Sequence, residues 1–355
     1  MKRKVTIYDI AKEAGVSPKT VSKVINNKDG VKFETRVKIL EIIKKTGYHP
    51  NIFARSLRVN TPACIGITFP APIEIVPFSS KFFLWLFYEL YRIFGKKGEY
   101  ICFDFMPYET FEIRNYARGV FDNLFRACVL VGPIALNDTT VRKIHDAGIP
   151  YVAFGRLSSF PEISHATVDY EYSAYISTKF LIERGHKVIG FLQAFDGYQP
   201  GAERIAGYRR ALEEFGIPFN KDLVQPVKFN FDSLYRSACY LLSNPSITAI
   251  VDGSGNEDPI ALREASRLAG KEFGKDVEIV IWTYEERRMI LREAIAHVWL
   301  PVRESATHGL EELSKWIAEE RSEPIRVLYP PRLDTARTRI EVEIPPEDRL
   351  FYRES

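Results

Sequence analysis

Six polar side chains close to the amino terminus have the residue types and the spacing to bind a nucleic acid. Hydroxyl and amide groups exchange hydrogen bonds with phosphates and base edges at close range, and ammonium groups attract phosphate charge. The apolar residues between them, Val21 and Val24, can pack inward, so that the polar set shares one outward face. The six side chains are Ser17, Lys19, Thr20, Ser22, Lys23 and Asn26. The segment is therefore a candidate for reading DNA.

Local signals place this face on the second of three short helices. Thr6 stands three residues before Asp9, which is the spacing of a capping box that begins a first helix, and Gly15 ends it. Ser17 is a suitable N-cap and Pro18 suits the first helical position, so a second helix is predicted over residues 18–26. On shape alone, a helical hairpin that only caps another domain remains an alternative.

A third amphipathic helix is predicted over residues 33–46. Val37, Leu40 and Ile43 are expected to point inward, and Gly47 ends the helix. Three helices of this size form a compact module that can hold the polar face outward.

Basic residues are concentrated in the same part of the chain. Residues 1–60 contain 14 Lys and Arg against 5 Asp and Glu, whereas all 355 residues contain 49 against 46. The remainder therefore holds 35 basic and 41 acidic residues, a net charge of −6 against +9 for the first part. A basic module on a mildly acidic body indicates a polyanionic partner for the module alone. This favours DNA binding over the alternative of a helical hairpin that only caps another domain.

The order of these motifs resembles the lac repressor/galactose repressor (LacI/GalR) family of bacterial transcription factors. The family pattern reads TIxDIAxxAGVSxxTVSxVxN, then a helix ending near GYxPN, then a hinge helix written ARSL. The matching stretches are residues 6–11, 14–17, 20–26, 47–51 and 54–57. The resemblance implies an all-α helix-turn-helix headpiece with a hinge helix, followed by a two-lobed α/β effector domain like the periplasmic binding proteins, with parallel sheets.

The resemblance also implies how DNA is bound. Two subunits of a homodimer place their second helices in successive major grooves of a pseudo-palindromic double-stranded operator, and paired hinge helices enter the minor groove. The residues implied to face bases are Pro18, Lys19 and Lys23, with Leu57 as the minor-groove wedge. Those implied to face phosphates are Thr6, Ser17, Thr20, Ser22, Asn26, Thr35, Tyr48 and Asn51. Lys23 departs from the usual Arg and cannot form a bidentate fork with guanine, so the operator is expected to differ.

From residue 61 onward, apolar strand-like runs alternate with helical stretches, which is typical of βαβ units and a parallel sheet. The strands are expected over residues 63–69, 100–105, 127–131, 151–154, 188–192, 247–251 and 277–282. The resemblance implies three crossings between two lobes, placed near residues 163, 296 and 323. The expected domains are a helix-turn-helix domain at 1–49, a hinge at 50–60, an N-terminal lobe at 61–162 plus 296–323, a C-terminal lobe at 163–295 plus 324–344 and a tail at 345–355.

Arg204 is the sharpest candidate in the body. It begins the pattern RxxGY, and the family arginine at this position lines the interlobe cleft and donates to oxygens of a sugar-like effector. The alternative is an exposed helix arginine. His186 has no nucleophile visibly placed beside it, so a structural hydrogen-bonding role is favoured over catalysis.

The sequence departs from the family pattern at the positions expected to determine which effector is bound. The Asn-Asp pair expected after one strand and the paired acids expected after the next are replaced by residues 252–258 and 282–285. The substitutes we expect to contact the effector are Asn256, Trp282, Thr283 and Tyr284, with the two aromatic rings stacking on a sugar. Phe82 and Phe83 are further candidates, with a core aromatic stripe as the equal alternative. Residues 252–258 also resemble a calcium loop, although Glu257 and Arg263 occupy positions that need Gly and an acid.

These observations favour a ligand-responsive, DNA-binding regulator, expected to repress carbohydrate-utilisation genes. The alternative is a doubly wound ligand-binding protein or enzyme acting on a sugar or nucleotide, but no GxGxxG or Walker motif follows a strand.

Four cysteines without CxxC spacing predict reduced thiols, and neither a metal, a cofactor nor a catalytic residue is expected. The apolar stretch 82–90 is too short to span a membrane, so a cytoplasmic protein is predicted. The tail holds Pro345 and Pro346 without leucine heptads, which argues against a helical tetramer bundle.

Overall fold

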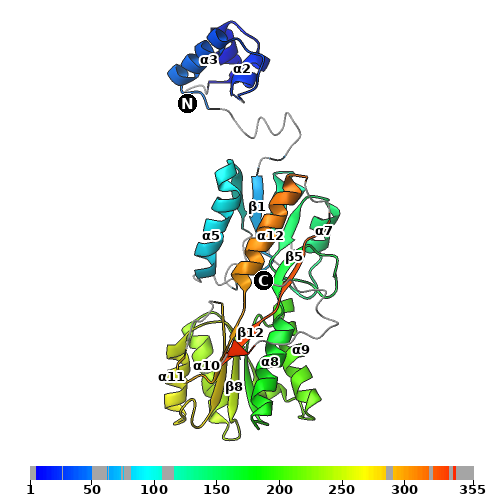
Figure 1. Ribbon diagram of the computed structural model, residues 1–355, viewed down its shortest axis with the longest axis vertical. Helices are drawn as coiled ribbons and strands as arrows, with labels where there is room; N and C mark the ends of the chain where they lie inside the picture. Colours follow the sequence, from blue (N-terminus) through cyan, green and yellow to red (C-terminus); the bar gives the residue numbers. More distant parts are fainter. Residues whose placement is uncertain are drawn as a thin grey trace. The chain divides into compact units, whose positions relative to one another are not determined.

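The computed structural model describes residues 5–25, 27–49, 62, 64–72, 75, 81–105, 116–284, 291–319, 323–335 and 339–340. The chain divides into two compact units, Met1–Ala63 and Cys64–Ser355, which we call the headpiece and the body (Figure 1). No helix in the described ranges is both long and apolar enough to cross a lipid bilayer.

The headpiece consists of α1 (Ile7–Ala14), α2 (Pro18–Ile25) and α3 (Phe33–Thr46). The predicted capping box is present, because the Asp9 N–H donates to the Thr6 hydroxyl oxygen and the Thr6 N–H donates to the Asp9 carboxylate at 2.9 Å. Gly15 and Gly47 end α1 and α3 in the left-handed conformation, with φ of 72° and 63°. The N–H of Thr20 donates to the Ser17 hydroxyl at 3.1 Å, as expected of an N-cap.

The buried face of α3 differs from the expectation. Ile39 and Ile42 pack against Ile10, Val21 and Val24, whereas the expected inward residues Val37 and Leu40 are 37% and 49% exposed. The prediction was wrong for these two residues because the apolar positions of α3 cover more than half of its circumference, and only the 39–42–43 stripe faces the other helices.

The body contains two mainly parallel sheets. The first has the order β11-β5-β4-β3-β1-β2, and the second has the order β13-β12-β10-β9-β8-β6-β7, where β12 runs antiparallel to both neighbours. The strands of the first sheet are β1 (Cys64–Thr68), β2 (Tyr100–Asp104), β3 (Phe125–Leu130), β4 (Tyr151–Ala153), β5 (His165–Val168) and β11 (Arg326–Tyr329). Those of the second are β6 (Ile189–Ala194), β7 (Val224–Val227), β8 (Ala249–Gly253), β9 (Glu278–Thr283), β10 (Ala296–Trp299), β12 (Arg332–Thr335) and β13 (Arg339–Ile340).

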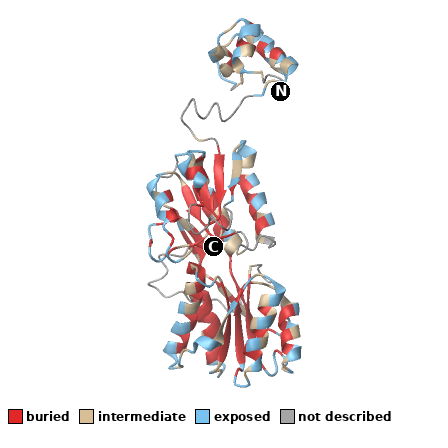
Figure 2. Cartoon of the chain, turned by 180° about the vertical axis from the view of Figure 1, so that it is seen from behind, coloured by how far each residue is buried: buried red, intermediate tan, exposed pale blue. Residues whose placement is uncertain are grey.

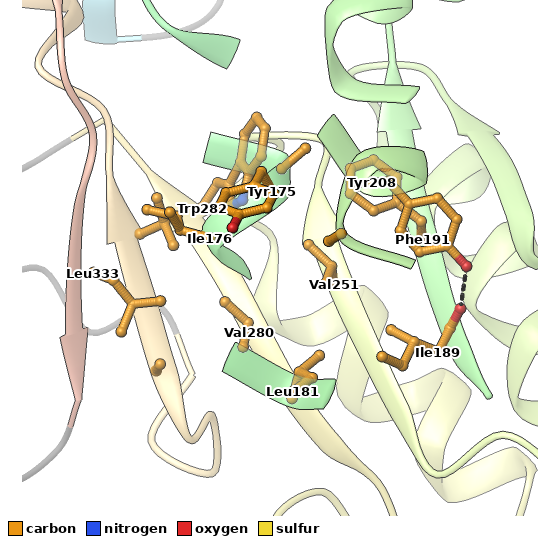
Figure 3. Close-up of a cluster of buried hydrophobic side chains, with 14 of the residues drawn as sticks. Tyr175, Ile176, Leu181, Ile189, Phe191, Tyr208, Val251, Val280, Trp282 and Leu333 are labelled. Atoms are coloured by element: carbon orange, nitrogen blue, oxygen red, sulfur yellow. Dashed lines mark hydrogen bonds between the residues drawn. The ribbon is translucent and has the colours of Figure 1, made fainter. Parts of the chain in front are cut away.

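Helices cover both sheets and define two lobes. The first lobe carries α5 (Lys81–Ile93), α6 (Arg118–Phe121), α7 (Thr140–Asp146) and α12 (Val302–Ile317). The second carries α8 (Tyr170–Glu183), α9 (Gln199–Glu214), α10 (Phe231–Ser243) and α11 (Pro259–Leu268). The strands are the most buried parts of both lobes (Figure 2), and α8 and α9 pack on the face of the second sheet that holds Phe191, Val251 and Trp282 (Figure 3). This is the two-lobed α/β architecture predicted from the sequence.

The strand pairing places the three crossings after Val168, Trp299 and Tyr329. The sequence placed them earlier, near residues 163, 296 and 323, and so assigned β5 and β11 to the second lobe and β10 to the first. These three strands have only four residues each, and the chain changes lobes at their carboxyl ends. Short apolar strands that precede a crossing carry no signal that tells which sheet they join.

A charged cluster at the amino ends of β8 and β9 braces the second sheet. Arg184 donates two hydrogen bonds to the Glu278 carboxylate, at 2.7 and 2.6 Å, and His186 lies 2.8 Å from the same carboxylate and 2.9 Å from the Thr248 hydroxyl. Both ring nitrogens of His186 are thus occupied by structural partners. The hydrogen bonds from Arg184 lower the pKa of Glu278 to about 2.

This brace predicts an acid-dependent loss of stability. Because the folded-state pKa of Glu278 lies below its unfolded value, its ionised form stabilises the fold above about pH 4.5, and this contribution disappears as the pH falls through about 2. We expect the thermal midpoint of Glu278→Gln to lie below that of the wild type at pH 6, with the difference narrowing steadily between pH 5 and pH 2. A difference that stays constant over this range would contradict the assignment.

Candidate DNA-binding and effector sites

The polar face of α2 lies open on the headpiece. Ser17 and Lys19 are exposed, and Pro18, Thr20, Ser22 and Lys23 are partly exposed. Val21 and Val24, on the opposite face, are buried at 0% and 4%. The helix therefore presents the predicted base-facing residues on the side away from the headpiece core.

Some hydroxyls of this face also serve the helix termini. The Ser17 and Thr20 hydroxyls lie 3.0 Å apart, and the Thr6 hydroxyl donates to Asp9 at 2.7 Å. Thr35, in the first turn of α3, and Tyr48, just after its end, are both partly exposed. Asn26, Asn51 and Leu57 lie outside the described residues, as does the predicted hinge.

The loop after α2 is held by Arg36. Its guanidinium donates to the Asn27 side chain at 3.0 Å and to the Lys28 carbonyl at 2.7 Å. Asn27 has a φ of 49°, a conformation that Asn tolerates better than most residues. The same loop carries Gly30, where an added Cβ would lie 3.3 Å from Nζ of Lys23. The ammonium group of Lys23 thus rests beside this loop.

Arg204 is the centre of the candidate effector site. Its side chain is fully buried, at 0% exposure, which excludes the exposed-arginine alternative. Nε donates to the Gly253 carbonyl at the carboxyl end of β8 at 3.0 Å, and Nη1 donates to the Pro200 carbonyl at 2.8 Å. Nη2 has no hydrogen-bond partner among the described residues. A buried donor without an acceptor is costly, which makes Nη2 a candidate for a ligand contact.

Aromatic rings surround the guanidinium. The ring of Tyr170 lies 4.2 Å from its central carbon, that of Trp282 lies 5.1 Å away and that of Phe195 lies 5.4 Å away. Ring faces stabilise a cation when water is excluded. Phe195 has a φ of 63°, an unusual backbone conformation for a bulky residue and one that tends to occur at functional sites.

Gly207 fixes the position of Arg204 relative to α8. A Cβ at Gly207 would overlap the carbonyl oxygen of Glu171, so only glycine lets α9 pack this closely on the first turn of α8. That turn carries Tyr170, whose ring lies on the guanidinium. The RxxG spacing therefore places the candidate ligand-binding cation one turn from a close contact between two helices.

The loop after β8 explains the departure from the family pattern. Asp258 caps α11 by accepting from the N–H groups of Ile260 and Ala261. Glu257, at a φ of 54°, accepts from the Thr283 hydroxyl at 3.0 Å and from the Tyr284 N–H at 2.9 Å. Glu257 was not predicted as a site residue, because its carboxylate reaches these partners only through a left-handed backbone turn that the sequence pattern does not indicate.

The calcium-loop alternative does not fit these contacts. Asp252 is buried and accepts from both the N–H and the hydroxyl of Ser254, while Glu257 and Asp258 bind elsewhere. Burial raises the pKa of Asp252 to about 6. Among the described residues, no group of three or more His, Cys, Asp or Glu is arranged to hold a metal ion.

The expected aromatic contacts need correction. Trp282 is a core residue with 0% exposure, whose Nε1 donates to the Ser177 hydroxyl at 2.9 Å, so its ring offers no open face to a sugar (Figure 3). It acts on the site through Arg204. Tyr284 is partly exposed and its hydroxyl lies against Gly255, where a Cβ would overlap it. Asn256 donates to the Asn230 carbonyl at 3.2 Å and ties the loop to α10.

Phe82 and Phe83 join the core of the first lobe. Phe83 is 3% exposed, and the partly buried Phe82 packs against Trp85 and Phe154 with ring centroids 5.3 and 6.4 Å apart. The structure thus favours the core stripe that the sequence left as an equal alternative.

A polar cluster with buried acids joins the two lobes beside Arg204. We call Arg156, Ser158, Asp169, Gln199 and Glu203 the interlobe cluster. Arg156, after β4, donates to Glu203 of α9 at 2.8 Å and to Asp169, the N-cap of α8, at 3.3 Å. The Gln199 side chain donates to Ser158 at 2.6 Å and its N–H donates to the Ile134 carbonyl at 2.8 Å. The carboxyl ends of the two sheets therefore face each other across this cluster.

Electrostatics make the interlobe cluster sensitive to the loss of one member. Glu203 is 5% exposed, and its burial raises its pKa even though Arg156 opposes the shift. The side chain of Arg156 is 26% exposed, so the cation reaches water while its partners do not. The pairing stabilises this lobe arrangement only while the cation is present.

Two family models match the chain. The model of the lacI family of bacterial regulatory proteins matches residues 6–51, and that of the periplasmic binding proteins and sugar binding domain of the LacI family matches residues 122–293. An HTH-type transcriptional regulator of Lachnoclostridium phytofermentans is 31% identical over 283 residues, covering 77% of this chain and 81% of that protein. The chain belongs to the lacI family of bacterial regulatory proteins.

Similarity extends over most of this lacI-family protein. Catabolite control protein A of Priestia megaterium is 27% identical over 336 residues, covering 93% of this chain and 98% of that protein. The lac repressor dimer bound to operator and the anti-inducer ONPF has a TM-score of 0.73 at 18% identity, covering 95% of this chain and 98% of that one, which shows a shared fold. The protein is a DNA-binding transcriptional regulator with an effector domain of the sugar-binding type, and its family is non-enzymatic.

The interlobe cluster of this lacI-family protein yields a prediction about stability. Arg156→Leu leaves Glu203 and Asp169 buried without their cation, so we expect the free energy of unfolding to fall by about 3 kcal/mol. The matched control is Arg267→Leu, because Arg267 is 77% exposed and pairs with Glu264 on the surface of α11, a contact worth less than about 1 kcal/mol. Denaturant unfolding followed by tryptophan fluorescence measures both, and equal small losses would show that the interlobe cluster is not a buried charge pair.

Proposed function

We propose that this protein is a repressor of carbohydrate-utilisation genes that binds a pseudo-palindromic operator as a homodimer and responds to a small sugar-like effector held between the lobes. The observation that carries the proposal is the buried Arg204 with its unsatisfied Nη2 at the carboxyl edge of the second sheet. In open α/β sheets, ligands bind outside the carboxyl ends of strands. Because its proposed target is chromosomal DNA, we infer that the protein acts in the cytoplasm.

The exposed face of α2 supports the DNA half of the proposal. In it, Pro18, Lys19 and Lys23 face base edges, and Leu57 opens a central base step. The phosphate contacts are Thr6, Ser17, Thr20, Ser22, Asn26, Thr35, Tyr48 and Asn51. The described members of both sets are exposed or partly exposed, as these roles require.

The effector half of the proposal is centred on Arg204. Tyr284 and Asn256, both partly exposed, stand with Thr283 on the neighbouring loops, and Glu257 holds those loops together. Trp282 is not an effector contact in this proposal, but its ring lies 5.1 Å from the guanidinium carbon of Arg204, and Phe82 and Phe83 belong to the core of the first lobe. Closure of the lobes around a ligand would alter the interlobe cluster, which gives the effector a route to the lobe arrangement.

The homodimer is supported by exposed apolar side chains along one side of the body. They lie on α5 and β2 in the first lobe and on α10 and α11 in the second, and Figure 1 shows α5, α10 and α11 on the same side. An exposed apolar surface that includes an edge strand favours association with a second copy. The members are Leu84, Phe87, Tyr88, Tyr91, Tyr100, Phe103, Phe105, Phe231, Tyr240, Ile260 and Leu268.

Selection of DNA by the full-length protein tests the central claim. Duplexes enriched from a randomised pool are expected to contain two inverted half-sites, since two symmetric α2 helices read successive major grooves. Lys23→Ala should cost about 1–3 kcal/mol and relax base choice at one or two positions of each half-site. Lys45→Ala is the control, because Lys45 lies on α3, away from α2, and pairs with Glu13 of α1 at 3.2 Å. The base preference of this variant should be unchanged. Enrichment of sequences without inverted symmetry would contradict the proposal.

If the exposed apolar side forms the homodimer interface, a charge introduced on α5 should strongly weaken self-association. Tyr88, 58% exposed, is expected to contact the second copy, so Tyr88→Glu should weaken self-association at least ten-fold by burying an unpaired carboxylate. Phe215→Glu provides the control, because Phe215 is 41% exposed at the end of α9, outside the apolar side. Sedimentation equilibrium measures both variants, and unchanged association of Tyr88→Glu would exclude this surface.

A further inference from the structure

We propose that the effector carries a negative charge, a carboxylate or a phosphate on a hydroxylated carbon skeleton, and that this anionic group pairs with Nη2 of Arg204. The inference rests on the proposed function, in that it names the chemical class of the ligand for that same site. The supporting observation is that the described residues compensate the positive charge of Arg204 only in part.

Arg204 has no ion pair with a described Asp or Glu. Two of its nitrogens donate to backbone carbonyls, at 3.0 and 2.8 Å, and its faces meet the rings of Tyr170, Trp282 and Phe195. Carbonyls and rings supply partial negative charge only. Within the described part of the chain, most of the positive charge of this fully buried guanidinium is therefore uncompensated, which is costly in a low-dielectric interior.

Three described carboxylates on the elements around Arg204 bind other groups. Glu203, its neighbour on α9, pairs with Arg156, and Asp252 accepts both hydrogen bonds of Ser254. Glu257 accepts from the Thr283 hydroxyl and the Tyr284 N–H. Each of these acids is held by a specific partner, so none turns its charge to the guanidinium.

The residues at the end of β9 strengthen the case. The last residue of β9, Thr283, and the residue that follows it, Tyr284, are both uncharged. Both side chains are neutral, and the phenol of Tyr284 can donate a hydrogen bond to an oxyanion, whereas the Thr283 hydroxyl already donates to Glu257. A neutral sugar would satisfy Nη2 as a hydrogen-bond donor but would leave the charge of the guanidinium unbalanced. An oxyanion satisfies both, with a charge-assisted hydrogen bond.

A second unsatisfied atom indicates that the ligand also carries hydroxyl groups. Gln193 is 2% exposed, and its Oε1 has no hydrogen-bond partner among the described residues. Gln193 pairs across the sheet with Gly253, whose carbonyl accepts from Nε of Arg204. An unpaired acceptor on β6, paired with the strand residue that binds the guanidinium, suits a polyol that bears an anionic group. Phe195, whose ring lies 5.4 Å from the guanidinium carbon, has a left-handed backbone.

Paired probes test the inference at constant ionic strength and pH 7.5. The pairs are D-glucose with D-glucose 6-phosphate and D-galactose with D-galacturonate, which separate phosphate from carboxylate, and inorganic phosphate is added as the simplest oxyanion. Thermal midpoints are measured for the wild type, Arg204→Met and Arg209→Met. Arg209 is the matched control because it is exposed on the same helix, with its guanidinium over Phe219 at 4.4 Å.

We expect inorganic phosphate and at least one anionic sugar to raise the wild-type midpoint by several degrees more than the neutral partner does. The gain should vanish in Arg204→Met and persist in Arg209→Met. Without any probe, Arg204→Met should be no less stable than the wild type, because it removes an unbalanced buried charge. A clear loss of stability of the ligand-free variant, an equal or larger response to the neutral sugars, or an anion response that survives Arg204→Met would each overturn the inference.

Operator binding in the same preparations separates this inference from the proposed function. A neutral sugar that binds through Arg204 and changes operator affinity would support the regulator and overturn the anionic effector. An anion that binds through Arg204 without changing operator affinity would support the charge assignment and contradict the proposed control of DNA binding.

Discussion

The ion pair between the partly exposed Arg156 and the buried Glu203 fixes the geometry on which the candidate effector site depends. It joins the loop after β4 to α9, and it shares Asp169 with the first turn of α8. The next residue, Tyr170, lies on the guanidinium of Arg204. Two adjacent residues at the first crossing thus link the lobe interface to the candidate ligand-binding cation. Because these residues are consecutive in the chain, a shift of Asp169 would also shift Tyr170.

The sequence predicted the headpiece almost completely, because its helices are defined by local interactions. The capping box at Thr6, the N-cap at Ser17 and the glycine ends at Gly15 and Gly47 need only residues a few positions apart. Which side of α3 is buried was harder to predict, since it depends on how three helices pack. Apolar residues lie around most of that helix, and packing selects Ile39 and Ile42 over Val37 and Leu40.

In the body, alternation of apolar runs with helices predicted the class of fold, and the matched positions of the RxxGY motif located Arg204. Strands β5, β10 and β11 were missed or misassigned because membership of a sheet is a long-range property. The site contacts beyond Arg204 were only partly predictable. Trp282 proved to be a core residue, and the role of Glu257 depends on a left-handed turn that spacing cannot reveal.

The direct contact of Gly207 with the backbone of α8 also limits how proteins of this design can diverge. A side chain there would push α9 outward and carry the arginine away from its rings, so a substitution of the glycine would also displace the arginine. Asn256, Glu257 and Tyr284 make hydrogen bonds away from α8, with one another's loops and with α10. Substitutions at these three positions can therefore alter the proposed ligand contacts while the helix packing that holds Arg204 stays the same.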